Sequence, residues 1–138
     1  MYSNINTLIR SEIAARPITY LGNNLEHVWI SDQHTENGAY VQVSTEFADP
    51  VSQEVGFDAA QNISGFIQFL VKLPQSDKGL NFAVNEIAQQ YFVAYPSQSK
   101  TVNDLTIEYQ PTGRPLEGRE DGFYTVTMRV SFNIYYCV

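Results

Sequence analysis

Histidines and carboxylates gather in one short stretch of the sequence, where His27, Asp32, His34 and Glu36 have side chains of the types that bind metals. A zinc site needs three or four such ligands converging at about 2 Å from the ion. The spacing here is loose and the segment around it is polar and loop-like, so ordinary surface histidines explain the group better. The sequence therefore predicts no metal site and no cofactor.

Nucleophilic and acid–base chemistry find little support in the sequence. Cys137 is the one cysteine, so it can form no internal disulfide. It would act as a nucleophile only beside a base in a pocket, and a buried or half-buried structural thiol is the better interpretation. The carboxylates show no pattern of an acid and a base, and the Gly113 to Gly118 spacing lacks the Lys and Ser or Thr of a phosphate-binding loop. We therefore expect a protein that is not an enzyme.

Length and composition favour one soluble domain over residues 1–138. Charged residues make up only 17% of the chain, and its net charge is −7. The eight basic residues form no run, so a grip on nucleic-acid phosphates is not expected. No apolar stretch approaches the roughly 18 residues of a membrane span, and the N-terminus lacks the pattern of a signal peptide. A polar surface with few charges suits contact with other proteins, in a chain made in the cytosol.

Two helices are predicted from apolar residues at helical spacing. The first should cover residues 4–15, with Ser3 or Asn4 as its cap, and it should end before Pro17. The second runs over residues 80–92 and should stop by Tyr95, after a cap at Ser76 or Asp77. Its apolar face must bury against a sheet; that face comprises Leu80, Ala83, Val84, Ile87, Ala88, Tyr91 and Phe92.

Strands are predicted over residues 27–30, 39–47, 63–73, 104–109 and 123–136. The strand at 63–73 is apolar on both faces and should lie centrally in the sheet. The last strand alternates almost without error and would run roughly 45 Å at ~3.3 Å per residue, so we expect one end to project or to pair with a neighbouring subunit. The element order predicts an α+β fold, an α/β sandwich whose antiparallel or mixed sheet carries both helices on one face.

Two long loops, at residues 48–62 and 110–122, supply most of the candidate partner-binding residues. The first has no basic residue and reads as an extended hairpin tip or an arm; the second is rich in Pro, Gly and charges. Long loops at sheet ends often bind partners. Tyr135 joins the candidates because the alternation sends this aromatic ring to the polar face of its strand. The candidates are Asp49, Glu54, Arg114, Glu117, Arg119 and Tyr135.

The centre of the chain resembles the tail-terminator-like family of long-tailed bacteriophages, to which the lambda tail terminator is similar in fold. The strand sequence GFIQFLV at residues 65–71 leads through a short turn to KGLNFAV at 78–84, and the helix reads AVNEIAQQYF at 83–92. That family shows a strand of Gly, aromatic, Gln and apolar residues, a turn ending in Gly, and an Ala-x-x-Ile-Ala-x-x-Phe helix. The first helix, the early strand with its long loop and the long last strand also match.

The resemblance implies a virion structural protein at the head-proximal end of the phage tail, assembled in the host cytoplasm. It implies a ring, expected to be a hexamer, that binds the tail-tube protein on one side and a head-completion or connector protein on the other. The ring would stop tube polymerisation and let DNA pass without specific binding; the acidic charge of the subunits would repel DNA from the bore. The family has no catalytic residues to carry over.

Two other functions stay open at this point. The chain can be another neck or head–tail joining protein of a phage, which would share its size, class and charge. It can also be a small enzymatic or ligand-binding α/β domain, which would need a pocket with convergent polar groups and perturbed pKa values. The sequence shows no such constellation.

Overall fold

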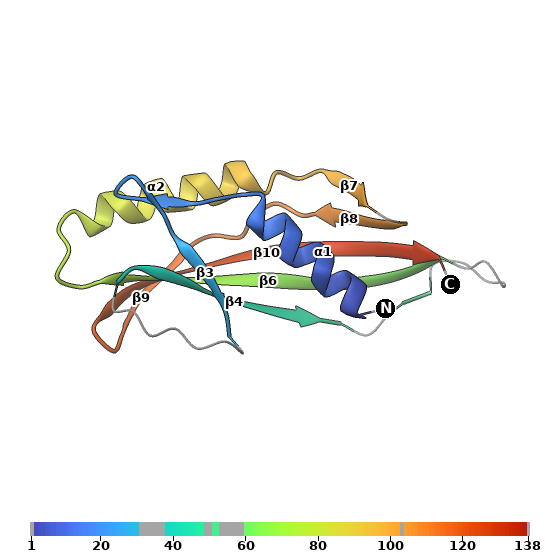
Figure 1. Ribbon diagram of the computed structural model, residues 1–138, viewed down its shortest axis with the longest axis horizontal. Helices are drawn as coiled ribbons and strands as arrows, with labels where there is room; N and C mark the ends of the chain where they lie inside the picture. Colours follow the sequence, from blue (N-terminus) through green and yellow to red (C-terminus); the bar gives the residue numbers. More distant parts are fainter. Residues whose placement is uncertain (1, 31–37, 49–50, 53–59, 103, 138) are drawn as a thin grey trace.

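The computed structural model describes residues 2–30, 38–48, 51–52, 60–102 and 104–137 of the chain. It contains two helices, α1 (Tyr2–Ala14) and α2 (Leu80–Ala94). The strands are β1 (Thr19–Tyr20), β2 (Asn23–Asn24), β3 (Glu26–Trp29), β4 (Tyr40–Phe47), β5 (Val51–Ser52), β6 (Ala60–Pro74), β7 (Ser99–Val102), β8 (Leu105–Tyr109), β9 (Leu116–Glu120) and β10 (Phe123–Cys137). Figure 1 shows both helices against a long, curled sheet.

The main sheet has the strand order β3-β4-β6-β10-β8-β7, with β5 beside β6 and β9 beside β10. All these pairings are antiparallel except that of β3 with β4, so the predicted antiparallel or mixed sheet is confirmed. The long strands β6 and β10 pair residue by residue from Ala60–Cys137 to Pro74–Phe123. The predicted central position of the 63–73 strand is confirmed, because β6 lies between β4 and β10.

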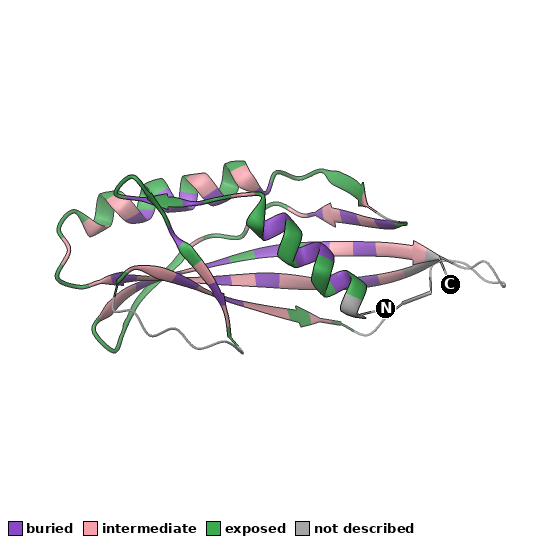
Figure 2. Ribbon diagram, viewed as in Figure 1, coloured by how far each residue is buried: buried purple, intermediate pink, exposed green. Residues whose placement is uncertain are grey.

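Alternation along the strands gives the sheet two different faces. Side chains of β6 and β10 that share one face, such as Ile67, Phe69, Met128 and Val130, are fully buried. The described side chains of the opposite face are half-buried or exposed, except for the buried Thr125, and Figure 2 shows the alternation along both strands. Both helices contribute to the core on the buried face, which confirms the α+β fold with its helices on one side.

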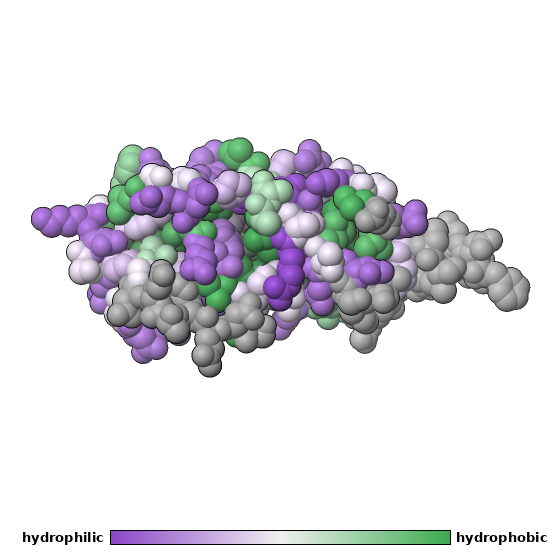
Figure 3. All heavy atoms as spheres, in the orientation of Figure 1, coloured by the Kyte–Doolittle hydropathy of each residue, from purple (hydrophilic) through white to green (hydrophobic). Residues whose placement is uncertain are grey.

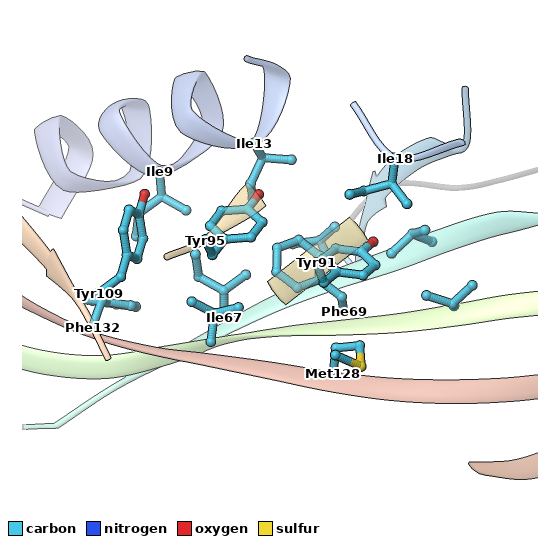
Figure 4. Packing of buried hydrophobic residues seen from close by; sticks show 14 of the residues in the cluster. Ile9, Ile13, Ile18, Ile67, Phe69, Tyr91, Tyr95, Tyr109, Met128 and Phe132 are labelled. Atoms are coloured by element: carbon cyan, nitrogen blue, oxygen red, sulfur yellow. The ribbon is translucent and has the colours of Figure 1, made fainter. Parts of the chain in front are cut away.

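Aromatic rings fill the space between α2 and the sheet. The ring centroid of Tyr91 on α2 lies 4.7 Å from that of Phe69, and the centroid of Tyr95, just after α2, lies 5.4 Å from it. Tyr109 of β8 packs edge-on against Tyr95, with 5.5 Å between the ring centroids. Figure 4 shows Ile9 and Ile13 reaching this layer from α1. Aromatic contacts at these separations add to the stability gained by burial itself. They fix the helix layer over the centre of the sheet.

Gly65 lies where neighbouring strands leave no room for a side chain. A Cβ atom here would overlap the backbone carbonyl oxygen of Glu46 on β4 and lie 3.1 Å from the ring of Phe132 on β10. Only glycine therefore fits beneath the Phe132 ring at this register. This residue is the first of the GFIQFLV sequence that carried the family resemblance.

The helix boundaries are close to those predicted, but the predicted caps are wrong. α1 begins at Tyr2, so Ser3 and Asn4 lie inside it. α2 begins after Gly79, whose left-handed backbone (φ 73°) precedes the helix without a side-chain cap. Asp77 instead accepts a hydrogen bond from the Tyr20 hydroxyl at 2.7 Å, which ties the hairpin β1–β2 to the turn before α2.

Five short strands were missed by the sequence interpretation, and two of them, β1 and β2, pair with each other as a small separate sheet. Residues 99–102 were read as loop but form β7, which pairs with β8. In the predicted loop 110–122, residues 116–120 form β9 and pair with the start of β10. In the predicted loop 48–62, residues 51–52 form β5 and 60–62 belong to β6, so the two sides of an extended hairpin are present. The segments 49–50 and 53–59 lie outside the described residues.

The last strand was predicted to project at one end or to pair with a neighbouring subunit, and the chain's own pairing bears on the first alternative. Each residue of β10 pairs with β6, and its other edge is occupied by β9 and then by β8. Between these strands the amides of Gln110 and Gly113 donate to the carbonyls of Ser131 and Arg129. The end of β10 therefore does not project alone, because β6 accompanies it to Cys137, and pairing with a neighbouring subunit stays a prediction.

Candidate interaction surfaces

The predicted partner-binding residues do not form one cluster in the described part of the chain. Glu117 and Arg119 lie on β9, Arg114 is exposed in the segment before it, and Tyr135 is half-buried near the far end of β10. Glu117 accepts a hydrogen bond from the Tyr124 hydroxyl at 3.0 Å. Asp49 and Glu54 lie outside the described residues. Tyr135 does point to the helix-free side, as its place in the alternation predicts.

The helix-free face of the sheet is a broad surface with few charges, which we call the open face. It consists of the residues of β4, β6 and β10 that alternate with the core positions, together with Leu116, Gly118 and Glu120 of β9. Its charged members are Glu46, Lys72, Arg129 and Glu120, and the Lys72 ammonium lies 3.9 Å from the Glu120 carboxylate. The Arg129 guanidinium lies 4.9 Å from the centre of the Phe66 ring and donates to Gln68 at 3.0 Å.

Apolar side chains also lie on the open face. Leu116 is 59% exposed, and the register places it beside Thr127, which has Leu70 on its other side. Directly paired residues of antiparallel strands point to the same face of a sheet, so these three form a row across the open face. A half-buried, weakly charged surface with aromatic and leucine side chains is typical of the centre of a protein interface.

The outer surface of the helix layer carries a second set of exposed apolar residues. Phe82 and Val93 of α2 are 70% and 69% exposed, and Leu21 in the turn between β1 and β2 is 73% exposed. A groove of about 350 Å³ separates the turn from α2. Figure 3 shows hydrophobic side chains exposed among hydrophilic ones over α2 and this turn. Phe92, predicted on the buried face of the helix, is 39% exposed and extends this surface.

A buried carboxylate joins the two helices to the edge of the sheet. Glu12 of α1 is 2% exposed, and it binds Arg16 at 3.0 Å, Lys100 of β7 at 2.8 Å and the Tyr109 hydroxyl at 2.8 Å. Arg16 also donates to the carbonyl of Ala94 at the end of α2. Burial tends to raise the pKa of Glu12, but the hydrogen bonds from Lys100 and Tyr109 and the charge of Arg16 hold it below its usual value. The carboxylate is thus ionised and fully satisfied.

His27 lies beside a groove of about 520 Å³ between α1 and β3, which Arg10 and Trp29 also line. Its Nδ1 lies 3.1 Å from the carbonyl oxygen of Leu25 and its Nε2 lies 2.9 Å from the Tyr91 hydroxyl oxygen. Burial lowers the pKa of His27, and the neutral ring then donates through Nδ1 and accepts at Nε2. Both nitrogens are used inside the fold, so His27 is a structural residue here.

The described residues give no support to a metal site at the histidines and carboxylates considered in the sequence. Of the four residues considered, Asp32, His34 and Glu36 lie outside the described residues. Among the residues that are described, no group of three or more His, Cys, Asp or Glu side chains could hold an ion. No helix in the described part of the chain is long and apolar enough to cross a membrane.

Several surface and network residues were missed by the sequence interpretation. Phe82 and Val93 fall outside the apolar stripe of their helix, and this offset was a readable signal of exposed apolar side chains. Glu12 and Arg16 have the four-residue spacing of a helical ion pair, so this pair could have been predicted from the sequence. Lys100 and Tyr109 come from segments about ninety residues away, so their part in the network was not readable from spacing.

Comparison with known proteins adds a fold neighbour. No family model matches the chain, and no curated protein matches it. One solved structure superposes with a TM-score of 0.69 over 94% of each chain, at 17% sequence identity. Identity this low shows a shared fold, and the neighbour carries no description of function. The α+β arrangement is therefore one that another solved protein also adopts.

Proposed function

We propose that this protein is a tail-terminator or tail-completion subunit of a long-tailed bacteriophage, a virion structural protein that forms a ring at the head-proximal end of the tail tube. The observation that carries the proposal is the two-sided surface of the molecule. One side is the weakly charged open face, and the opposite side exposes Leu21, Phe82 and Val93. A subunit that must meet neighbours on two sides needs two such surfaces.

The proposed mechanism is steric and requires no catalysis. One rim of the ring, expected to be a hexamer, resembles the next layer of tail-tube protein and docks on it. The other rim does not, so growth ceases and a head-completion or connector protein binds there. The weak charge of the chain outside its loops supports contact with protein, because charged groups are depleted at interface centres.

The acidic character of the subunit supports the passage of DNA through the ring without specific binding. The net charge is −7, and the segments 31–37 and 48–59 contain five acidic residues and no Lys or Arg. A bore lined by such subunits repels phosphates and leaves DNA free to move. This arrangement belongs to a virion component that is assembled in the host cytoplasm.

The enzymatic or ligand-binding alternative has less support from the described residues. Its best site is the groove beside His27, where both ring nitrogens already have partners inside the fold. A neck or head–tail joining role remains the stronger alternative, because such a subunit would need the same two-sided surface. The two roles differ in the particle that the protein binds first.

Binding to separated phage parts tests the proposal against this alternative. The full chain is incubated with tail tubes that lack heads and, separately, with DNA-filled heads that lack tails, and bound protein is located by immunogold labelling and electron microscopy. A tail-completion subunit labels one end of the tubes. Label on the head portal alone would replace the proposal by the joining role, and label on neither part would contradict both.

A further inference from the structure

Each of the two opposite surfaces carries a charge between apolar groups, with opposite signs. On α2, Phe82, Glu86 and Val93 share one exposed stripe, because they lie within about 40° of each other around the helix axis. At ~1.5 Å per residue, Glu86 stands roughly 6 Å from Phe82 and roughly 10 Å from Val93 along the axis. Gln89 is exposed on the same side of the helix, so the stripe reads apolar, negative, amide, apolar over about 16 Å.

The open face carries the matching pattern with a positive centre. The row of Leu70, Thr127 and Leu116 lies two residues along β10 from Arg129, and the row of Ser131 and Phe66 lies two residues further on. At ~3.3 Å per residue these steps are roughly 7 Å each, so the pattern spans about 13 Å. It reads apolar, positive, apolar, with the Arg129 guanidinium held over the Phe66 ring.

We propose that the α2 stripe of one subunit docks on the open face of a second copy of this chain, with Glu86 of the first beside Arg129 of the second. The charges are opposite, and each charge has apolar groups on both sides, at roughly 6 and 10 Å along the stripe and at roughly 7 Å each way on the open face. Exposed Phe82 and Val93 would gain burial against the Leu70–Leu116 row and Phe66, which is favourable in proportion to the apolar area removed from water.

This contact is heterologous, because it joins two different surfaces of the same chain. Each subunit keeps a free stripe at one end and a free open face at the other, so the contact repeats. Repetition closes into a ring when the rotation between neighbours divides a full turn. The inference rests on the proposed function in that it names the contact by which the proposed ring would form.

Cysteine cross-linking tests the contact directly. In a Cys137→Ser background, one protein carries Glu86→Cys and another carries Arg129→Cys, and the two are mixed under mild oxidation. Both positions are exposed in the single chain, so neither change disturbs the core. The inference predicts disulfide-linked dimers in the mixture and none in either protein alone. Equal dimer formation by one protein alone, or none in the mixture, would overturn it.

Charge exchange gives a second, independent readout. Sedimentation velocity of concentrated protein should show roughly tenfold weaker self-association for Glu86→Arg and for Arg129→Glu, because like charges then face each other at a partly desolvated contact. The double variant should recover association. Singles that associate like the parent would contradict the contact. If the protein caps tail tubes but the charge variants associate like the parent, the proposed function stands and this contact is wrong. If the charge variants behave as predicted but the protein caps no tubes, the contact stands and the proposed function is wrong.

Discussion

Single side chains decide how the helices are held to the sheet, and Glu12 is the most constrained of them. Its carboxylate is buried and receives donors from three residues: Lys100 of β7, Tyr109 of β8 and Arg16, which follows the end of α1. Removing a buried charge that completes such a network leaves its partners unsatisfied. The stability of the helix layer should therefore depend on this residue more than on any exposed carboxylate.

Glu12→Gln should lower the free energy of unfolding by about 2 kcal/mol, because Lys100 and Arg16 lose their charged acceptor. Urea denaturation followed by circular dichroism measures the change. Asp104→Asn is the control, since Asp104 is exposed between β7 and β8, outside the proposed contact, and its change should alter stability by less than about 0.5 kcal/mol. Equal effects at the two positions would refute the role assigned to Glu12.

The same residue should impart a pH dependence to stability. The pKa of Glu12 in the folded chain is lowered from the ordinary value of 4.5, so the carboxylate favours the folded state fully above that pH. Its contribution is lost as the pH falls below 4.5 through the lowered pKa. The urea concentration at the unfolding midpoint, measured from pH 6 downward, should fall less steeply for Glu12→Gln than for the parent. If the midpoints of the two proteins fall in parallel, Glu12 is not the source of the pH dependence.

Gly65 sets the spacing between β4 and β6 and should not tolerate a side chain. Gly65→Ala should cost about 2 kcal/mol or more, because the new methyl group overlaps the Glu46 backbone and presses on Phe132. Gly38→Ala serves as its control, since nothing lies within 4 Å of a Cβ there. Thermal unfolding compares the two variants, and similar melting temperatures would show that the strands can move apart freely.

At the scale of elements, the turn between β9 and β10 determines how the edge strand folds back. Asp121 and Gly122 have φ angles of 47° and 84°, the left-handed pair of a tight hairpin turn. Gly122→Ala should lower stability by about 1 kcal/mol, because an L side chain is strained there. Gly122→Asn should cost less, since Asn enters this conformation more readily. If denaturation shows the Asn variant to be less stable than the Ala variant, the left-handed turn conformation assigned to Gly122 is contradicted.

The elements that could be predicted from the sequence are those with a strong period. β10 alternates almost without error and α2 has a regular apolar stripe, and both were placed to within two residues. β6 was recognised by its apolar run. Each of these elements is positioned by burial of its own side chains, which leaves a trace in the residue pattern.

The strands β5, β7 and β9 could not be predicted because tertiary pairing holds them. All described side chains of β9 are exposed, and it contains Gly118 and three charged residues, which have low strand propensity. It forms because β10 continues past the core and offers unpaired backbone groups. The exposed residues of β7 likewise pair with β8. Similarly, the surfaces assigned to partners depend on which strands lie side by side, so only Tyr135 and the loop charges could be proposed beforehand.

At the scale of the whole molecule, the chain is a two-layer sandwich whose outer surfaces both carry apolar side chains. The layers are joined by an aromatic core and by the Glu12 network, so the subunit is a firm support for contacts on either side. The groove beside His27 shows no free catalytic group on that residue. The apolar outer surfaces and the firmly joined layers are the features on which the proposed assembly role rests.

The measurement that tests this account most directly is the length of tail tubes polymerised in the presence of the protein. Tail-tube protein of the same phage is polymerised with increasing amounts of the full chain, and tube lengths and tube ends are recorded by negative-stain electron microscopy. The account predicts shorter tubes, each bearing a ring of added density at one end. Tubes of unchanged length with bare ends at every concentration would contradict it.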